Sequence, residues 1–187
     1  MGQTQGPPVE ACSARARPED VFEGEQRKGS FLCAQILPHS ITMHFHASCA
    51  ALHHQPGADA LLILGPSGAG KSDLLLRLID KGFALVADDQ VIIEDGLARP
   101  AEALAGLIEV RGLGLFCLPF IAPAKVRLVV SLGTVLAARL PDPQTHNLLH
   151  VPEIRIDSAL PSATARVALA LEAACGRIAQ HAGAFAA

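Results

Sequence analysis

The chain has 187 residues and half of them are hydrophobic, so it is long enough for one compact domain with a sizeable core. Its formal net charge is -3 and it has no run of lysines and arginines, which argues against nucleic acid as the main partner. No apolar run reaches the roughly eighteen residues that a spanning helix needs, so we expect no membrane partner. The five cysteines are scattered without a C-x-x-C pair, which favours buried, reduced thiols and a cytoplasmic protein.

Residues 1–40 differ in composition from the rest of the chain. They are polar, charged and rich in glycine and proline, and they offer too little apolar surface to offset the entropy of ordering. We therefore expect a disordered N-terminal extension at 1–40, followed by a domain at 41–187. Met43 stands where the patterned sequence begins, so a start site assigned too far upstream is an alternative that stays open.

The first patterned segments alternate between strand and helix signals. Residues 41–52, ITMHFHASCAAL, alternate well enough for one strand, and a turn with proline and glycine follows. Residues 60–65, ALLILG, form a short apolar run that is typical of a buried strand. Residues 71–82, KSDLLLRLIDKG, place four apolar side chains at helical spacing and end with Gly82, so they predict an amphipathic helix.

Later segments add further strands and a last helix. The runs FALVA at 83–87 and QVIIE at 90–94 predict two strands, and VRLVVSL at 126–132 predicts another. Residues 101–110 fit either a short helix or a strand, and the sequence does not decide between them. Residues 164–182 predict a C-terminal helix. The mixture of strands and helices, with several consecutive strands, predicts an α/β fold with a mixed sheet.

A glycine-rich loop, GPSGAGKS, matches the pattern G-x-x-x-x-G-K-[ST] in full. Its glycines let backbone N–H groups turn toward a phosphate, and the helix that follows presents its positive end to the same anion. Lys71 can reach the β- and γ-phosphates, and the hydroxyl of Ser72 can bind Mg²⁺. We therefore predict binding of a nucleotide triphosphate and Mg²⁺ by the eight loop residues, which are Gly65, Pro66, Ser67, Gly68, Ala69, Gly70, Lys71 and Ser72.

Two adjacent carboxylates, Asp88 and Asp89, follow the predicted strand at 83–87. The carboxyl ends of strands in an open α/β sheet are where ligands bind, so both aspartates are candidates for the site. One carboxylate suffices to hold Mg²⁺, and a second is then free to accept a proton from an attacking hydroxyl. The alternative is that they merely begin a turn.

The motifs' spacing excludes two other nucleotide-binding classes. Transporter-type ATPases carry an LSGGQ-like signature before a more distant metal aspartate, and this chain has none. Kinases of the shikimate type carry D-x-D on the strand before the loop, which GADALLILG does not supply.

The sequence resembles the catalytic domain of HPr kinase/phosphorylase. Four pieces carry the resemblance in order: His46–Ala47, residues 65–89, the signature LIEVRGLGLF at 107–116, and the strand at 126–132. The match is to a short form that consists of the C-terminal catalytic domain only. It implies a P-loop kinase domain with a mixed sheet, like that of HPr kinases and phosphoenolpyruvate carboxykinases, with a C-terminal helix.

The resemblance implies an ATP-dependent protein serine kinase that acts on HPr, the phosphocarrier of the sugar phosphotransferase system, or on a paralogue of it. Many members also remove the phosphate with inorganic phosphate, and whether this chain does so stays open. In the family's pattern Asp88 resembles the general base, Asp89 the partner carboxylate near the metal, and His46 the histidine that orients them. Glu109 resembles a glutamate near Mg²⁺. Catalytic roles thus fall to Asp88, Asp89, His46 and Lys71, and metal binding to Ser72, Asp89 and Glu109.

The C-terminal part departs from the family pattern. Residues 156–173 stand where the family has a proline-, arginine- and glycine-rich stretch that serves assembly and HPr docking. The family forms hexamers, so the resemblance implies a homo-oligomer, but its order stays open. Alternatives are a nucleotide-binding regulatory protein without transferase activity and a kinase acting on a small carboxylate. His44, His46, His53 and His54 could also form a metal site, although they lack ligand spacing.

Overall fold

The computed structural model describes residues 41–54, 56–133 and 138–186. The predicted disordered extension at 1–40 lies outside the described residues. Within the described ranges, no helix is both long and apolar enough to cross a membrane.

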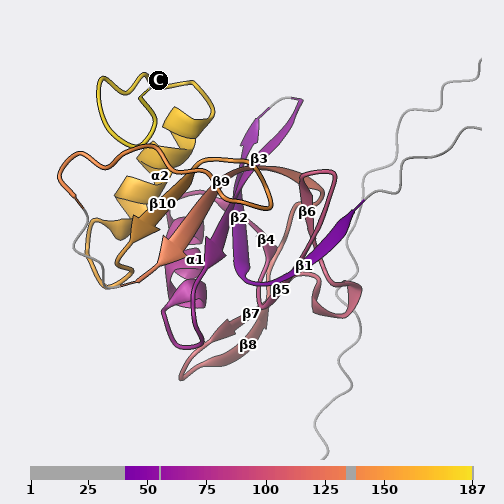
Figure 1. Cartoon of the computed structure of the whole chain (residues 1–187). Helices are drawn as coiled ribbons and strands as arrows, with labels where there is room; N and C mark the ends of the chain where they lie inside the picture. Colours follow the sequence, from indigo (N-terminus) through magenta and orange to yellow (C-terminus); the bar gives the residue numbers. More distant parts are fainter. Residues whose placement is uncertain (1–40, 55, 134–137, 187) are drawn as a thin grey trace, which may run out of the picture.

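The centre of the molecule is an eight-stranded sheet in the order β1-β5-β6-β9-β3-β2-β4, with β10 added beside β9. Strands β3, β9 and β10 are mutually parallel where they pair, and the other pairs are antiparallel, so the predicted α/β fold with a mixed sheet is confirmed (Figure 1). The bounds are β1 Thr42–His46, β2 Ser48–His54, β3 Gly57–Leu64, β4 Ala84–Ala87, β5 Gln90–Glu94, β6 Leu97–Pro100, β9 Ala124–Leu132 and β10 Glu153–Ile156.

Strand β9 organises the sheet because it pairs along both edges. Strand β3 runs parallel to it on one side, with Leu64 opposite Ser131. On the other side β6 pairs with its beginning, and β10 runs parallel to its end, with Ile156 opposite Leu132. The chain therefore leaves β3 and β10 at the same edge of the sheet.

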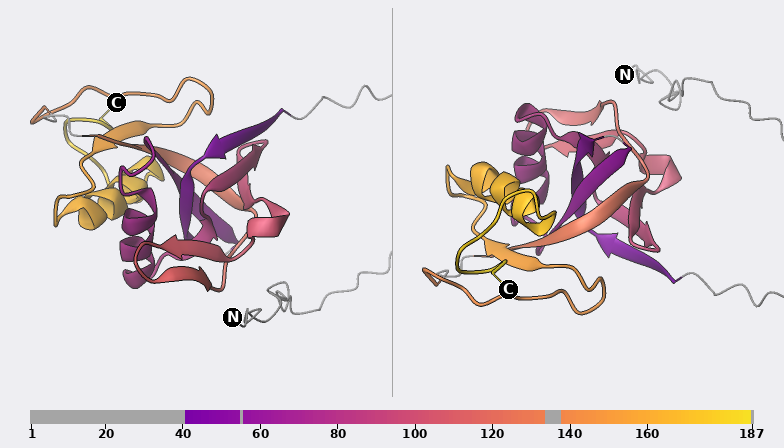
Figure 2. Two further views of the ribbon diagram at one scale, coloured as in Figure 1. Left: turned by 90° about the horizontal axis from the view of Figure 1, so that it is seen from below. Right: turned by 90° about the horizontal axis from the view of Figure 1, so that it is seen from above.

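Both α-helices of the described chain, α1 (Lys71–Asp80) and α2 (Ala163–Ala174), cover one face of the sheet (Figures 1 and 2). Side chains alternate along β3, so Leu61 and Ile63 pack toward the helices while Ala60 and Leu62 face the other way. The helix-side core joins these residues to Leu74, Leu75, Leu78, Val167 and Leu171.

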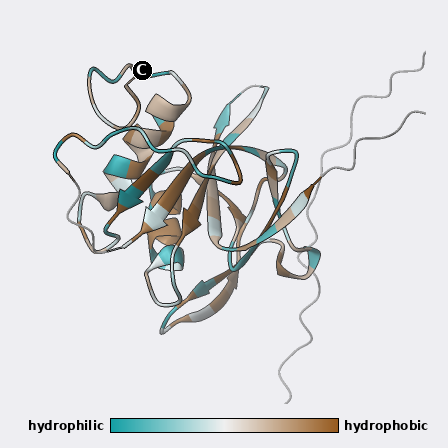
Figure 3. Cartoon of the chain, in the orientation of Figure 1, coloured by the Kyte–Doolittle hydropathy of each residue, from teal (hydrophilic) through white to brown (hydrophobic). Residues whose placement is uncertain are grey.

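The opposite face of the sheet is buried by the sheet itself. Val91 and Ile93 of β5 share a second buried cluster with Leu62 of β3 and Val129 of β9, although β5 does not pair with either strand. The sheet must therefore curl so that its two halves face one another. Figure 3 shows the resulting concentration of hydrophobic residues in the central strands.

A separate two-stranded sheet consists of β7 (Leu107–Val110) and β8 (Gly114–Cys117). A 3-10 helix, η1 (Glu102–Leu104), precedes it, so residues 101–110 contain one short helical turn and one strand. Ile108 is the buried anchor of this hairpin in the helix-side core.

Three sequence predictions need correction. The single strand predicted at 41–52 is two strands that separate at Ala47, because β1 pairs with β5 whereas β2 pairs with β3 and β4. The helix predicted at 164–182 ends at Ala174, and Gly176 follows with a φ of 70°, a left-handed conformation that terminates helices. The prediction of buried, reduced cysteines holds for Cys49, but Cys175 is a free thiol that is only partly buried, and Cys117 is exposed and disulfide-bonded.

Candidate active site

The glycine-rich loop connects β3 to α1, as its pattern predicts. Two of its glycines, Gly68 and Gly70, have φ values of 80° and 86°, which other residues rarely adopt. Gly65 lies so close to β9 that a Cβ atom there would approach the side chain of Leu132 to 3.1 Å. The loop therefore wraps tightly over the end of the sheet and delivers the chain to the first turn of α1.

Lys71, the first residue of α1, is buried and points back into the loop. Its Nζ atom donates hydrogen bonds to the carbonyls of Gly65 at 3.1 Å and Pro66 at 3.2 Å. Two carbonyl oxygens thus hold the ammonium group beside the N-terminus of α1. A cation and free N–H groups in one place form a binding site for phosphate.

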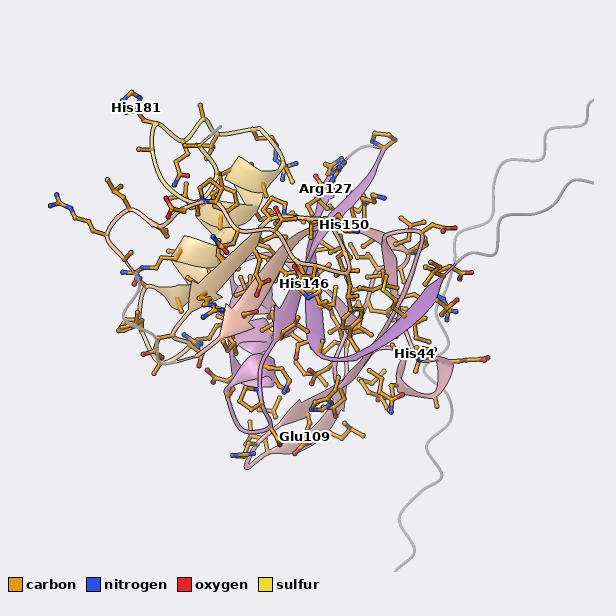
Figure 4. The ribbon with its side chains drawn as sticks, viewed as in Figure 1. His44, Glu109, Arg127, His146, His150 and His181 are labelled. Atoms are coloured by element: carbon orange, nitrogen blue, oxygen red, sulfur yellow. The ribbon has the colours of Figure 1, made fainter. Side chains whose placement is uncertain are left out.

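A pocket of about 330 Å³ opens beside this loop. It is bounded by the loop and the first turns of α1, by the ends of β1 and β4, and by the β7–β8 hairpin, on which Figure 4 labels Glu109. The lining residues are His46, Ser67, Gly68, Gly70, Lys71, Ser72, Asp73, Leu76, Asp89, Glu109, Val110 and Arg111. The structure therefore brings together most of the residues that the sequence singles out.

Asp88 lies underneath this pocket and is only 4% exposed. Its Oδ1 atom accepts a hydrogen bond from the hydroxyl of Ser72 at 3.1 Å and another from Ser48 at 2.5 Å. The N–H of Glu109 lies 3.4 Å from Oδ2, at the long end of hydrogen bonding. Asp88 is thus fixed against Ser72, whose hydroxyl is expected to bind Mg²⁺.

Asp89 is exposed, lines the pocket and has a φ of 63°. Its carbonyl accepts a hydrogen bond from the N–H of Ala47 at 3.2 Å, and Nδ1 of His46 lies 3.1 Å from the same oxygen. The left-handed residue breaks the strand alternation, so two neighbouring carboxylates reach the same site. His46 contacts the backbone of Asp89.

Further residues around the pocket come from the β7–β8 hairpin and from β2. Arg111, which belongs to the signature at 107–116, lines the pocket. Among the described residues, no group of three or more histidines, cysteines and carboxylates is placed to hold a metal ion. Ser48 has no sequence motif that would predict its role, because its contact with Asp88 depends on the pairing of β2 with β4.

Comparison with known proteins points to one family. Residues 55–121 match the family model of the HPr Serine kinase C-terminal domain. The chain is 39% identical over 135 residues to the HPr kinase/phosphorylase of Aromatoleum aromaticum, covering 61% of this chain and 42% of that protein. It is 46% identical over 63 residues to the HPr kinase/phosphorylase of Clostridium novyi, covering 32% of this chain and 20% of that protein.

A solved structure has the same fold. The Hpr(Ser) kinase/phosphatase from Coxiella burnetii superposes with a TM-score of 0.56 and 23% identity, over 72% of this chain and 96% of that chain. The chain spans less than half the length of the two relatives above. The matched residues nevertheless include the glycine-rich loop, both aspartates and the β7–β8 hairpin. The chain is therefore similar to the C-terminal domain of HPr kinases over residues 55–121, and it shares the fold of the solved structure.

Proposed function

We propose that residues 41–187 form an ATP-dependent protein serine kinase domain that phosphorylates HPr or a paralogue of HPr. The observation that carries the proposal is the pocket in which Lys71, Ser72 and Asp89 meet the signature hairpin at Glu109. The names of the matched relatives favour this function over a regulatory protein without transferase activity. Use of ATP fits the cytoplasm, where this nucleotide is available.

The donor atoms around Ser72 suit Mg²⁺ together with a nucleotide. A hydroxyl and carboxylates are the hard oxygen ligands that this ion prefers, and Ser72, Asp88 and Glu109 would hold it directly or through water. When bound, Mg²⁺ neutralises charge that develops on the transferred phosphoryl group. Lys71 supplies a further positive charge from the other side of the loop by exchanging its carbonyl partners for phosphate oxygens.

The family resemblance implies that Asp88 is the general base and that Asp89 lies near the metal. The geometry supports the opposite assignment. Asp88 is buried and held by Ser72 and Ser48, so its carboxylate suits the metal side of the site. Asp89 is exposed to the pocket, where the hydroxyl of a substrate serine could approach. We infer that Asp89 accepts the proton of that hydroxyl and that Asp88 orients Ser72.

His46 supports this assignment because it contacts the backbone carbonyl of Asp89. Its Nδ1 atom lies 3.1 Å from the carbonyl oxygen of Asp89, so the imidazole can restrain the residue in its left-handed conformation. A restrained backbone limits where the carboxylate of Asp89 can lie, which suits a base that must meet one hydroxyl.

The surroundings of the pocket suit a protein substrate. The β7–β8 hairpin forms one wall, and its tip exposes the large apolar side chains of Leu113 and Leu115. Exposed apolar side chains beside a pocket are typical of a surface that a protein partner covers, as a protein that delivers a serine to this pocket would. Assembly into a homo-oligomer is part of the same proposal, and light scattering of the purified protein measures it.

The proposal is tested by transfer of label from γ-³²P-ATP to HPr-like proteins of the same cell in the presence of Mg²⁺. We expect a labelled serine, and loss of at least a hundredfold in rate for Lys71→Ala, because no other side chain of the loop carries positive charge. Lys81→Ala, on the exposed end of α1, is the matched control and should keep the rate.

Absence of transfer to any HPr-like protein, with nucleotide binding intact, would reject the kinase proposal. Adding inorganic phosphate to seryl-phosphorylated HPr in the same assay, and measuring release of pyrophosphate, tests whether the reverse activity is present.

A further inference from the structure

A serine far from the glycine-rich loop in sequence holds the backbone of that loop. The hydroxyl of Ser158, in the turn after β10, donates a hydrogen bond to the carbonyl of Ala69 at 2.8 Å. The contact spans 89 positions of the sequence. It exists because β3 and β10 both run parallel to β9 and therefore release the chain at the same edge of the sheet.

This hydrogen bond has a consequence for the next N–H group. In a trans peptide the C=O and N–H bonds point in opposite directions, and the peptide between Ala69 and Gly70 is trans. Because Ser158 holds the carbonyl of Ala69 on the side of the β10–α2 turn, the N–H of Gly70 points to the opposite side. Gly70 lines the pocket, and among the described residues its N–H has no hydrogen-bond acceptor.

Ser158 is itself fixed by α1. The guanidinium of Arg77 donates to the carbonyl of Ser158 at 2.6 Å and forms an ion pair with Asp73 at 2.9 Å. The packing is tight, since a Cβ atom added to Gly70 would come within 2.9 Å of the Ser158 hydroxyl. The turn after β10 is thus locked between the glycine-rich loop and the outer side of α1.

We propose that Ser158 is a positioning residue for nucleotide binding, which turns the N–H of Gly70 toward the phosphate. The backbone N–H groups of such a loop are useful only if they converge on one anion. Without the hydroxyl of Ser158, the peptide between Ala69 and Gly70 is free to rotate, and one donor is lost from the phosphate site. The inference rests on the nucleotide-binding part of the proposed function, and it does not depend on the protein substrate.

Calorimetric titration of the full chain with Mg²⁺-ATP and with pyrophosphate tests the proposal without any protein substrate. We expect Ser158→Ala to weaken both ligands roughly tenfold, as loss of one hydrogen bond to a charged group predicts. Ser158→Thr, which keeps the hydroxyl, should restore affinity. Ser162→Ala is the matched control, because Ser162 lies in the same connection, is exposed and makes no capping hydrogen bond with its side chain.

The amide resonance of Gly70 provides a readout that a general loss of stability would not reproduce. On addition of pyrophosphate to the wild-type protein, its proton signal should move strongly downfield, and in folded Ser158→Ala the shift should be much smaller. Equal affinities of Ser158→Ala and wild type, or an unmoved Gly70 amide in the wild type, would overturn the proposal. A wild-type protein that binds neither ligand would instead reject nucleotide binding itself.

Discussion

Neighbouring residues on a strand normally point to opposite faces, so a pair of adjacent aspartates should place one carboxylate away from any site. In this chain the left-handed backbone of Asp89 changes that outcome. Asp88 reaches Ser72 from below, and Asp89 reaches the pocket from its rim. The left-handed conformation costs an ordinary residue roughly 1 kcal/mol, and the contacts of Ala47 and His46 with the carbonyl of Asp89 hold it.

The division of work between the aspartates predicts different responses to Mg²⁺. For Asp89→Asn we expect the transfer rate to fall by roughly a hundredfold or more at every Mg²⁺ concentration, because an amide cannot accept the proton. For Asp88→Asn we expect a higher Mg²⁺ requirement and partial recovery at excess Mg²⁺, because the change weakens the surroundings of Ser72. Initial rates at saturating ATP over a Mg²⁺ titration distinguish the two. If excess Mg²⁺ instead rescued Asp89→Asn and not Asp88→Asn, Asp88 would be the general base.

The sequence predicted contiguous features of the site well and scattered ones poorly. Lys71 and Ser72 could be identified because the loop pattern, the strand before it and the helix after it are local. Which aspartate contacts Ser72 could not be predicted, because the answer depends on one backbone angle at Asp89. Ser48 and Ser158 were missed because only the pairing of distant strands brings them to the site.

At the scale of elements, hydrophobic periodicity located the segments and tertiary pairing decided their limits. Helix α1 was predicted because Leu74, Leu75 and Leu78 recur on one side of it, and all three are buried. The strand predicted at 41–52 was wrong because its alternation continues through Ala47, where the chain changes partners from β5 to β3. Strand β10 has only four residues, which is too short for a clear pattern.

The helix-side core predicts unequal effects for two leucines of α1. Leu78 is fully buried in that core, so we expect Leu78→Ala to lower the free energy of unfolding by about 3 kcal/mol, through lost burial and a residual cavity. Leu76 is 37% exposed, and Leu76→Ala should cost less than about 1 kcal/mol. Urea unfolding followed by circular dichroism measures both. Similar losses for the two variants would contradict the assignment of the helix face.

At the scale of the whole molecule, a buried carboxylate joins segments that lie far apart in the sequence. Asp59 of β3 accepts hydrogen bonds from Arg127 of β9 at 2.8 Å and from Arg177, beyond α2, at 2.6 Å. Nε2 of His54 lies 2.9 Å from the same carboxylate. Figure 4 shows Arg127 at the end of the molecule opposite Glu109, so this cluster is remote from the pocket. It fastens the chain after α2 to the sheet.

The charge of Asp59 should make stability depend on pH in acid. Burial by itself raises the pKa of Asp59, but the hydrogen bonds from Arg127 and Arg177 outweigh it and lower the pKa from 3.8 to about 2. A carboxyl group whose pKa is lower in the folded state stabilises the fold fully above pH 3.8, and that contribution is lost as the pH falls toward 2. The contribution corresponds to about 2 kcal/mol, since one pKa unit is about 1.4 kcal/mol.

Urea unfolding of wild type and Asp59→Asn between about pH 5 and pH 2.5 measures this contribution. The variant should be less stable at pH 5, because it leaves two arginines beside a neutral amide, and the difference should narrow as the pH falls. Asp80→Asn, an exposed carboxylate at the end of α1, is the matched control and should track the wild type throughout. A difference that stays constant over this range would mean that Asp59 stabilises the fold by shape and hydrogen bonding rather than through its charge.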